Sequence, residues 1–126
     1  MIGIIIVSHS AKLAAGVKDI ICMMAPEVLV SVAGGHEDGS YGICRPLIRS
    51  AMRDMRKADH VLVFMDLGSA STAVEDISGE FPLGKFEMMN CPMVEGAVNA
   101  AVMIAGGAPL KDVLRAAMES RNAFKF

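Results

Sequence analysis

The stretch that decides the fold is Ile2–Ser10, which reads Ile-Gly-Ile-Ile-Ile-Val-Ser-His-Ser. A continuous apolar run of this kind is typical of a parallel strand that is covered on both faces. The polar triplet that ends it, with His9 at its centre, would lie at the carboxyl end of that strand. Ligands of open parallel sheets bind outside the carboxyl ends of the strands, so His9 is the first candidate functional residue.

The rest of the chain alternates short β-branched runs with helical periodicity, which is typical of an α/β protein with a parallel sheet. The first helix is predicted to bury Leu13, Val17, Ile20, Ile21 and Met24 and to end before Pro26. We expect one domain over residues 1–126, a three-layer α/β/α fold with a mainly parallel four-stranded sheet. The other predicted elements are strands over 28–33, 60–65 and 86–89, and helices over 43–57, from Ser69, from Pro92 to 105, and over 110–121.

Composition excludes several classes of function. The chain has 126 residues, of which 53% are hydrophobic, and a net charge of −2, which offers no basic surface for nucleic acid or anionic membrane. The apolar stretch 91–109 is interrupted by Glu95 and Asn99, so no membrane-spanning helix is expected. The three cysteines form no C-x-x-C pair, which fits a cytoplasmic protein and gives no indication of a metal site.

Nucleotide and hydrolase motifs are also missing. The loop after the first strand is not G-x-G-x-x-G, and the chain has neither G-x-x-x-x-G-K-[ST] nor G-x-S-x-G. His9 is then the strongest nucleophile candidate, and phosphoryl relay is the favoured chemistry.

Three loops are predicted to meet at the carboxyl edge of the sheet, and they carry His9, Gly34-Gly35 and the segment 66–69. If the first and third strands are neighbours, His9 and Asp66 lie within hydrogen-bond reach. A carboxylate that accepts the proton of one imidazole nitrogen fixes the tautomer and leaves the other nitrogen nucleophilic. Backbone N–H groups of the glycine loop and of a helix capped by Ser69 would bind phosphate oxygens. The alternatives are that His9 only caps a helix, that Asp66 is a turn residue and that the glycines form a bend.

Two surface features have open interpretations. Arg45, Arg49, Arg53 and Lys57 recur at four-residue steps, which indicates a solvated helix face or a surface for an acidic partner. Apolar residues at the expected rim of the site could form a docking ring, namely Met65, Leu67, Met93 and Val94.

Several blocks of this sequence resemble a known family. The blocks Ile-Ile-Ile-Val-Ser-His-Ser at 4–10, Asp-Leu-Gly-Ser-Ala at 66–70 and Pro-Met-Val-Glu-Gly-Ala at 92–97 are similar to DhaM. DhaM is the phosphotransfer subunit of phosphoenolpyruvate-dependent dihydroxyacetone kinase and is related to the mannose-type IIA domains of the sugar phosphotransferase system. The resemblance runs from residue 2 to about residue 120, and it includes the shorter blocks 13–17, 33–35 and 61–65.

The resemblance implies a phosphotransferase subunit with a IIA(mannose)-like fold and a homodimeric state. It implies that His9 takes a phosphoryl group from phospho-HPr as a covalent phosphohistidine, with Asp66 as its partner. The group would pass to ADP held on DhaL, which with DhaK phosphorylates dihydroxyacetone. No permanently bound cofactor and no metal are expected, and HPr is expected to be a separate protein. The residues expected around the phosphate are Ser10, Gly34, Gly35, Gly68, Ser69 and Ala70.

One departure from the family and two other functions stay open. The chain has Gly42-Ile43-Cys44 where the family usually has Gly-Thr-Ser, so a hydroxyl is missing after the glycine loop. The alternatives are a IIA domain of a mannose-type sugar transporter, which would pass phosphate to a IIB protein, and a regulator that is phosphorylated on histidine without catalysing transfer. A homodimer is also expected because the helix after Pro92 is too apolar to be covered by one small domain.

Overall fold

The computed structural model describes residues 1–126 and contains one four-stranded sheet in the order β2-β1-β3-β4. All three strand pairs are parallel, which confirms the predicted sheet. The strands are β1 (Ile2–Ser8), β2 (Val30–Gly34), β3 (His60–Met65) and β4 (Phe86–Met88). The helices are α1 (Ala11–Met24), α2 (Arg45–Arg53), α3 (Ser71–Ser78), α4 (Met93–Ala105) and α5 (Leu110–Glu119), with a 3₁₀ turn, η1 (Gly68–Ala70), before α3.

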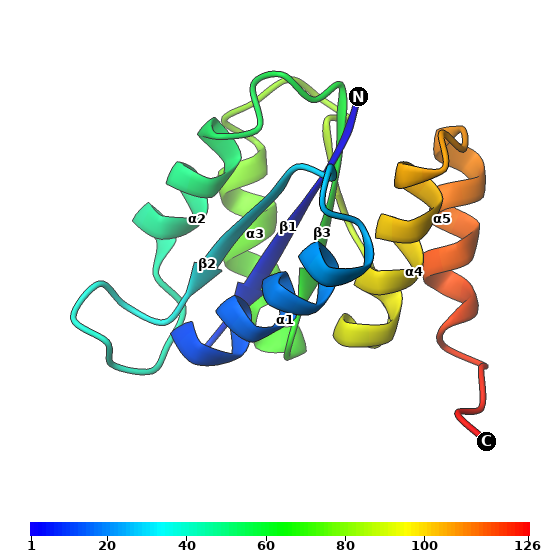
Figure 1. Cartoon of the computed structure of the whole chain (residues 1–126). Coiled ribbons are helices and arrows are strands. Elements are labelled where there is room, and N and C mark those ends of the chain that lie inside the picture. Colours follow the sequence, from blue (N-terminus) through cyan, green and yellow to red (C-terminus); the bar gives the residue numbers. More distant parts are fainter.

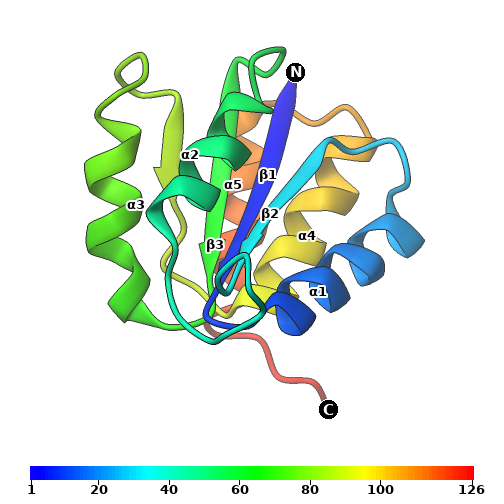
Figure 2. The same ribbon diagram turned by 90° about the vertical axis from the view of Figure 1, so that its left-hand side faces the viewer.

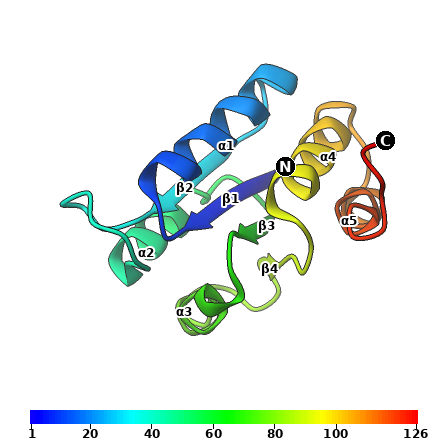
Figure 3. The ribbon, with the colours of Figure 1, turned by 90° about the horizontal axis from the view of Figure 1, so that it is seen from below.

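The elements form three layers, as the sequence predicted. Helices α2 and α3 cover one face of the sheet and α1 and α4 cover the other, with α5 packed outside α4 (Figures 1 and 2). The view from below in Figure 3 separates these layers. Figures 1 and 2 show that the carboxyl end of β1, the start of α1 and the start of α4 lie at one end of the molecule.

Two separate cores explain why β1 is apolar at every position before Ser8. Ile4 and Ile6 face the layer of α1 and α4, whereas Ile5 and Val7 face the layer of α2 and α3. Successive strand residues point to opposite faces, so a strand with helices on both sides has no solvent-facing position. All four side chains are fully buried.

The buried face of α1 differs from the predicted one. Ala14, Val17 and Ile21 are buried, but Leu13, Ile20 and Met24 are 42%, 40% and 52% exposed. Ala14 packs against β2 at Gly34, where the two segments are so close that a Cβ on Gly34 would lie 2.8 Å from Ala14 Cβ. Because the buried and exposed apolar stripes are adjacent in the sequence, periodicity alone does not say which of them faces the sheet.

The second helix is shorter than the predicted 43–57, and two of its basic side chains already have acidic partners. Arg45 Nη1 lies 3.0 Å from Asp76 Oδ2, and two nitrogens of Arg49, Nε and Nη2, each lie 2.8 Å from a carboxylate oxygen of Glu80. These exposed ion pairs join α2 to α3 within the chain.

Two further local predictions need correction. Ser69 is not the N-cap of the third helix, because η1 intervenes and the N-cap of α3 is Ala70, without a side-chain hydrogen bond. Helix α5 packs against the apolar helix α4 on the side away from α1. The side-chain amide of Asn99 in α4 donates a 3.2 Å hydrogen bond to the carbonyl of Ala116 in α5. The apolarity of α4 therefore does not by itself require a second copy of the chain.

None of the helices combines the length and the apolar character that crossing a membrane requires.

Two glycine substitutions test the packing of α1 on the sheet. A Cβ on Gly34 would come within 2.8 Å of Ala11 Cα and Ala14 Cβ, whereas one on Gly16 would have no neighbour within 4 Å. We expect Gly34→Ala to lower the free energy of unfolding by about 2 kcal/mol through overpacking. Gly16→Ala should raise it by about 0.5–1 kcal/mol, because glycine is a poor helix former.

Urea unfolding of the two variants and the wild type measures both changes. Equal stabilities of the Gly34→Ala variant and the wild type would contradict the close approach of β2 and α1.

Candidate active site

His9 lies in the two-residue link between β1 and α1. Ser8 ends the strand, and Ser10 is the N-cap of α1, where its hydroxyl accepts a 3.2 Å hydrogen bond from the Leu13 amide. The Ser10 amide donates in turn to the Ser8 hydroxyl at 3.0 Å. The peptide on each side of His9 is thus held, and the His9 side chain stays 28% exposed at the edge of the sheet.

Asp66 follows β3 directly and accepts four hydrogen bonds through its two carboxylate oxygens. Oδ2 accepts from the Ser8 hydroxyl and from the His9 amide, both at 2.9 Å. Oδ1 accepts from His9 Nδ1 at 3.0 Å and from the Leu67 amide at 2.7 Å. The register that pairs Val7 with Met65 brings the next residues of the two strands together, so the predicted contact of His9 and Asp66 is present.

The charge of this carboxylate is stabilised in the fold. Burial alone would raise the pKa of Asp66, but the hydrogen bonds from the His9 amide and ring, the Ser8 hydroxyl and the Leu67 amide outweigh burial. The pKa of Asp66 therefore lies below its ordinary value, and the carboxylate is ionised at neutral pH.

The two nitrogens of the His9 ring have different partners. Nδ1 faces Asp66 Oδ1, an oxygen that can only accept a hydrogen bond, so Nδ1 carries the proton of the neutral ring. Nε2 then holds the lone pair, and it accepts a 3.1 Å hydrogen bond from the Ser69 hydroxyl. This arrangement presents one nucleophilic nitrogen toward η1.

Backbone donors near Nε2 come from η1. The amides of Gly68 and Ser69 have no hydrogen-bond partner within the chain, and η1 runs directly into α3. Unpaired amides at the start of a helix attract anions. The amides of Gly35 and Ala70 are already used, because they donate to the carbonyls of Ser8 at 3.0 Å and Leu67 at 3.2 Å.

The remaining residues of the predicted phosphate loop have structural contacts. Gly34 allows β2 to approach the first turn of α1, and Gly35 has a φ of 60° that favours glycine. Ala70 is fully buried in the core under α3. Among the residues predicted around the phosphate, Gly68 and Ser69 have unpaired amides and belong to the turn that brings the Ser69 hydroxyl to His9 Nε2.

Two contributors were missed by the sequence analysis. Ser8 is completely buried, and its hydroxyl links Asp66 to the Ser10 amide. Gly42 donates its amide to the His9 carbonyl at 2.9 Å, and the ring of His36 packs against Gly42. Gly42 has a φ of 142°, a backbone conformation that favours glycine. The polar residue that ends an otherwise apolar strand was the available signal for Ser8.

The departure at Ile43 and Cys44 has a visible structural counterpart. Cys44 is the N-cap of α2, and its side chain makes no capping hydrogen bond. A hydroxyl at this position would be a better cap. No group of three or more histidine, cysteine or acidic side chains is arranged to hold a metal ion.

Comparison with known proteins identifies the class. The family model described as the PTS system fructose IIA component, EIIA-man, matches residues 3–114. A crystal structure of a phosphotransferase system EIIA component from Streptococcus agalactiae has the same fold, with a TM-score of 0.69, 20% identity and coverage of 97% of this chain and 93% of that one. A crystal structure of a protein of unknown function superposes with a TM-score of 0.83 at 30% identity, covering 99% of this chain and 96% of that one. The chain belongs to the EIIA-man family of the phosphotransferase system.

The curated relatives narrow this assignment. The phosphoryl donor subunit DhaM of PEP-dependent dihydroxyacetone kinase 1 from Listeria innocua is 39% identical over 102 residues, or 81% of each chain. DhaM of Lactococcus lactis is 33% identical over 88% of this chain and 89% of that protein. DhaM of Escherichia coli is 34% identical over 98% of this chain, which corresponds to 28% of that longer protein. Within the EIIA-man family, this chain is a member of the DhaM group of phosphoryl donor subunits.

The pH dependence of stability tests the Asp66 network. The lowered pKa of Asp66 means that its contribution to stability is complete above the ordinary value of 3.8 and is lost as the pH falls below that value. We expect Asp66→Asn to lower the free energy of unfolding at pH 7 by about 2–3 kcal/mol, because an amide nitrogen would face two donors. This deficit should shrink as the pH falls from 5 to 2.5.

Urea unfolding across this pH range measures the difference, and Asp54→Asn, which removes an exposed carboxylate, is the control. A deficit of Asp66→Asn that stays constant down to pH 2.5 would contradict an ionised Asp66 at the centre of the network.

Proposed function

We propose that Nε2 of His9 accepts a phosphoryl group from phospho-HPr and passes it to ADP held on DhaL, which together with DhaK phosphorylates dihydroxyacetone. The observation that carries this proposal is that the two His9 nitrogens have different partners: Nδ1 contacts the Asp66 carboxylate, and Nε2 contacts the Ser69 hydroxyl. The DhaM relatives support this reaction, because they are phosphoryl donor or phosphotransferase subunits of dihydroxyacetone kinases.

The proposed transfer is a pair of in-line displacements. The Nε2 lone pair attacks phosphorus, the bond from phosphorus to the donor nitrogen breaks, and its electron pair returns to the donor. The proton on Nδ1 stays in place, and the Asp66 carboxylate balances the charge that the ring gains. In the second step an oxygen of the ADP β-phosphate attacks phosphorus, and the electron pair of the P–N bond returns to Nε2. The intermediate is a phosphohistidine, and this chain needs no cofactor of its own, because the nucleotide is held on DhaL.

The protein contributes mostly positioning and charge stabilisation to such a transfer. The amides of Gly68 and Ser69 and the Ser69 hydroxyl bind the phosphoryl oxygens, at the start of the helical segment that continues into α3. Ser10, Gly34, Gly35 and Ala70 shape this site by holding the loops around it.

A relay of this kind operates in the cytoplasm, where its protein partners act. A homodimer is part of the proposal, because α1 leaves an apolar stripe exposed that nothing in one chain covers. The residues of this stripe are Leu13, Ile20, Met23 and Met24.

Reconstitution tests the relay. The chain is incubated with phosphoenolpyruvate, enzyme I and HPr, and DhaK, DhaL with ADP and dihydroxyacetone are then added. We expect a label on His9, its loss on addition of the acceptor and formation of dihydroxyacetone phosphate. His9→Ala should abolish labelling, whereas His60→Ala, which removes an exposed histidine at the start of β3, should not. Ser69→Ala should lower the transfer rate about ten- to hundredfold, because it removes one donor to the transferred group.

The alternatives give other results. Transfer to a mannose-type IIB protein in place of DhaL would assign the chain to sugar transport. A stable label on His9 with neither acceptor would indicate a regulator. The absence of any label would contradict all three functions.

A further inference from the structure

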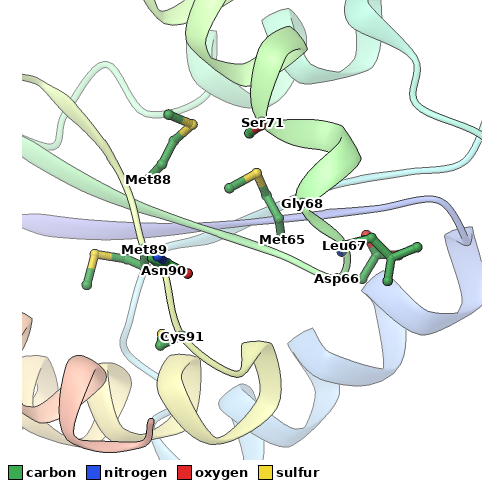
Figure 4. A pocket seen from close by; sticks show the side chains of 9 residues that line it. All are labelled: Met65, Asp66, Leu67, Gly68, Ser71, Met88, Met89, Asn90 and Cys91. Carbon is green, nitrogen blue, oxygen red and sulfur yellow. The ribbon is translucent and has the colours of Figure 1, made fainter.

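Ser8 and Ser120 are the two residues with polar side chains that the fold buries, and Ser8 has no exposed surface at all. The Ser120 hydroxyl donates to the Ala117 carbonyl of α5 at 2.6 Å. The Ser8 hydroxyl instead donates to the ionised group of the site, Asp66 Oδ2, at 2.9 Å. Figure 4 shows Asp66 at the end of β3, where it lines an open pocket. Ser8 holds the same carboxylate from within the core.

The proton of the Ser8 hydroxyl has a fixed direction. A serine hydroxyl carries one proton and two lone pairs. The Ser10 amide donates to the Ser8 oxygen at 3.0 Å, and the hydroxyl proton is given to Asp66 Oδ2. A chain of donors therefore runs from the Ser10 amide through the Ser8 hydroxyl to the carboxylate, and each hydrogen bond in such a chain polarises the next one.

Of the four donors to Asp66, the Ser8 hydroxyl is the one whose loss leaves the carboxylate in place. Oδ2 would still accept from the His9 amide, and Oδ1 would still accept from the His9 ring and the Leu67 amide. A carboxylate with fewer donors is more basic and attracts the Nδ1 proton more strongly. Burial raises the pKa of Asp66, and the Ser8 hydroxyl is one of the hydrogen-bond donors that lower it.

The position of the Nδ1 proton decides how easily His9 releases a phosphoryl group. When an acceptor oxygen attacks phosphorus, the P–Nε2 bond breaks and its electron pair returns to the ring. If the proton is on Nδ1, the ring leaves as neutral imidazole. If the proton has moved to Asp66 Oδ1, the ring leaves as an imidazolate anion, which is far more basic and a poorer leaving group. A more basic Asp66 also stabilises the charged phosphohistidine ring and so retains the phosphoryl group.

We propose that Ser8 is a positioning residue of the relay: by donating to Asp66 Oδ2 it keeps the proton of phosphorylated His9 on Nδ1, so that the phosphoryl group stays transferable. The inference rests on the proposed function, because it concerns the release of the group from His9. The two steps then have different requirements. Uptake needs the Asp66 carboxylate, whereas release needs that carboxylate to be only weakly basic. Ser8 and His9 are the residues whose side chains donate to Asp66, so Ser8 is the one that sets this basicity without taking part in the transfer.

The experiment measures phosphoryl exchange between HPr and the chain. A limiting amount of phospho-HPr is mixed with the chain, and the label on each protein is quantified at equilibrium. Rapid quenching then gives the rate of uptake from phospho-HPr and the rate of release from phosphorylated His9 to HPr. The variants are Ser8→Ala, which removes the donor, Ser8→Thr, which keeps a hydroxyl, and Ser120→Ala, which removes the other buried serine hydroxyl outside the Asp66 network.

We expect Ser8→Ala to shift the equilibrium about tenfold toward the phosphorylated chain, because it removes one hydrogen bond to a charged acceptor. Most of this change should be a slower release, with uptake changed little. Ser8→Thr should restore the equilibrium of the wild type, and Ser120→Ala should not alter it.

A measurement on the wild type makes the test independent of how the variants fold. The chain is phosphorylated with phosphoramidate, a small donor that needs no partner protein, and the ¹³C resonance of the Asp66 carboxyl group is recorded by nuclear magnetic resonance. It should show an ionised carboxylate in the phosphorylated chain.

Three results would overturn the proposal. The first is an equilibrium of Ser8→Ala equal to that of the wild type. The second is a shift of Ser8→Ala toward phospho-HPr with slower uptake, which would assign Ser8 only to the placement of Asp66. The third is a protonated Asp66 in the phosphorylated wild type. Failure of the proposed function looks different, because phospho-HPr would then not label the wild type, while the ¹³C resonance would still show where the proton lies.

Discussion

The carboxylate of Asp66 joins the two central strands of the sheet at the point where both end. It accepts hydrogen bonds from the Ser8 hydroxyl, the His9 amide, the His9 ring and the Leu67 amide, so it fixes the chain after β1 and the chain after β3 together. One partly buried carboxylate can hold this many groups only because all of them are donors. The same contact that closes the end of the sheet therefore also decides which nitrogen of His9 has a free lone pair.

The rest of the fold brings these groups to an exposed edge. Because helices cover both faces of β1, its polar residues can lie only at its end, where the sheet opens to solvent. Gly34 lets β2 pass close to the first turn of α1, and Gly42 reaches back to the His9 carbonyl. A relay site has to be both rigid and accessible, and the structure meets both needs by building it from main-chain contacts at a sheet edge.

The sequence was sufficient for the parts of the fold that depend on long apolar runs and on strand ends. It predicted the parallel sheet, the three layers and the contact between His9 and Asp66, since parallel strands carry the residues after them to one edge. It was right that Val17 and Ile21 are buried in α1, but wrong about Leu13 and Ile20, which lie one position away from buried residues. It did not show that Arg45 and Arg49 form ion pairs with Asp76 and Glu80, because an ion pair with a neighbouring helix cannot be read from the spacing of one helix. Ser69 faces His9 rather than capping α3, because a 3₁₀ turn precedes that helix. The role of Ser8 had one local signal, namely that it is the polar residue that ends an otherwise apolar strand.

The central claim concerns the two nitrogens of His9, and nuclear magnetic resonance of the phosphorylated chain with ¹⁵N-labelled histidine tests it most directly. The account predicts that ³¹P couples to Nε2 of His9 and that Nδ1 keeps its proton, held by Asp66. Coupling of ³¹P to Nδ1 would contradict it, because the nitrogen that faces the carboxylate would then be the nucleophile.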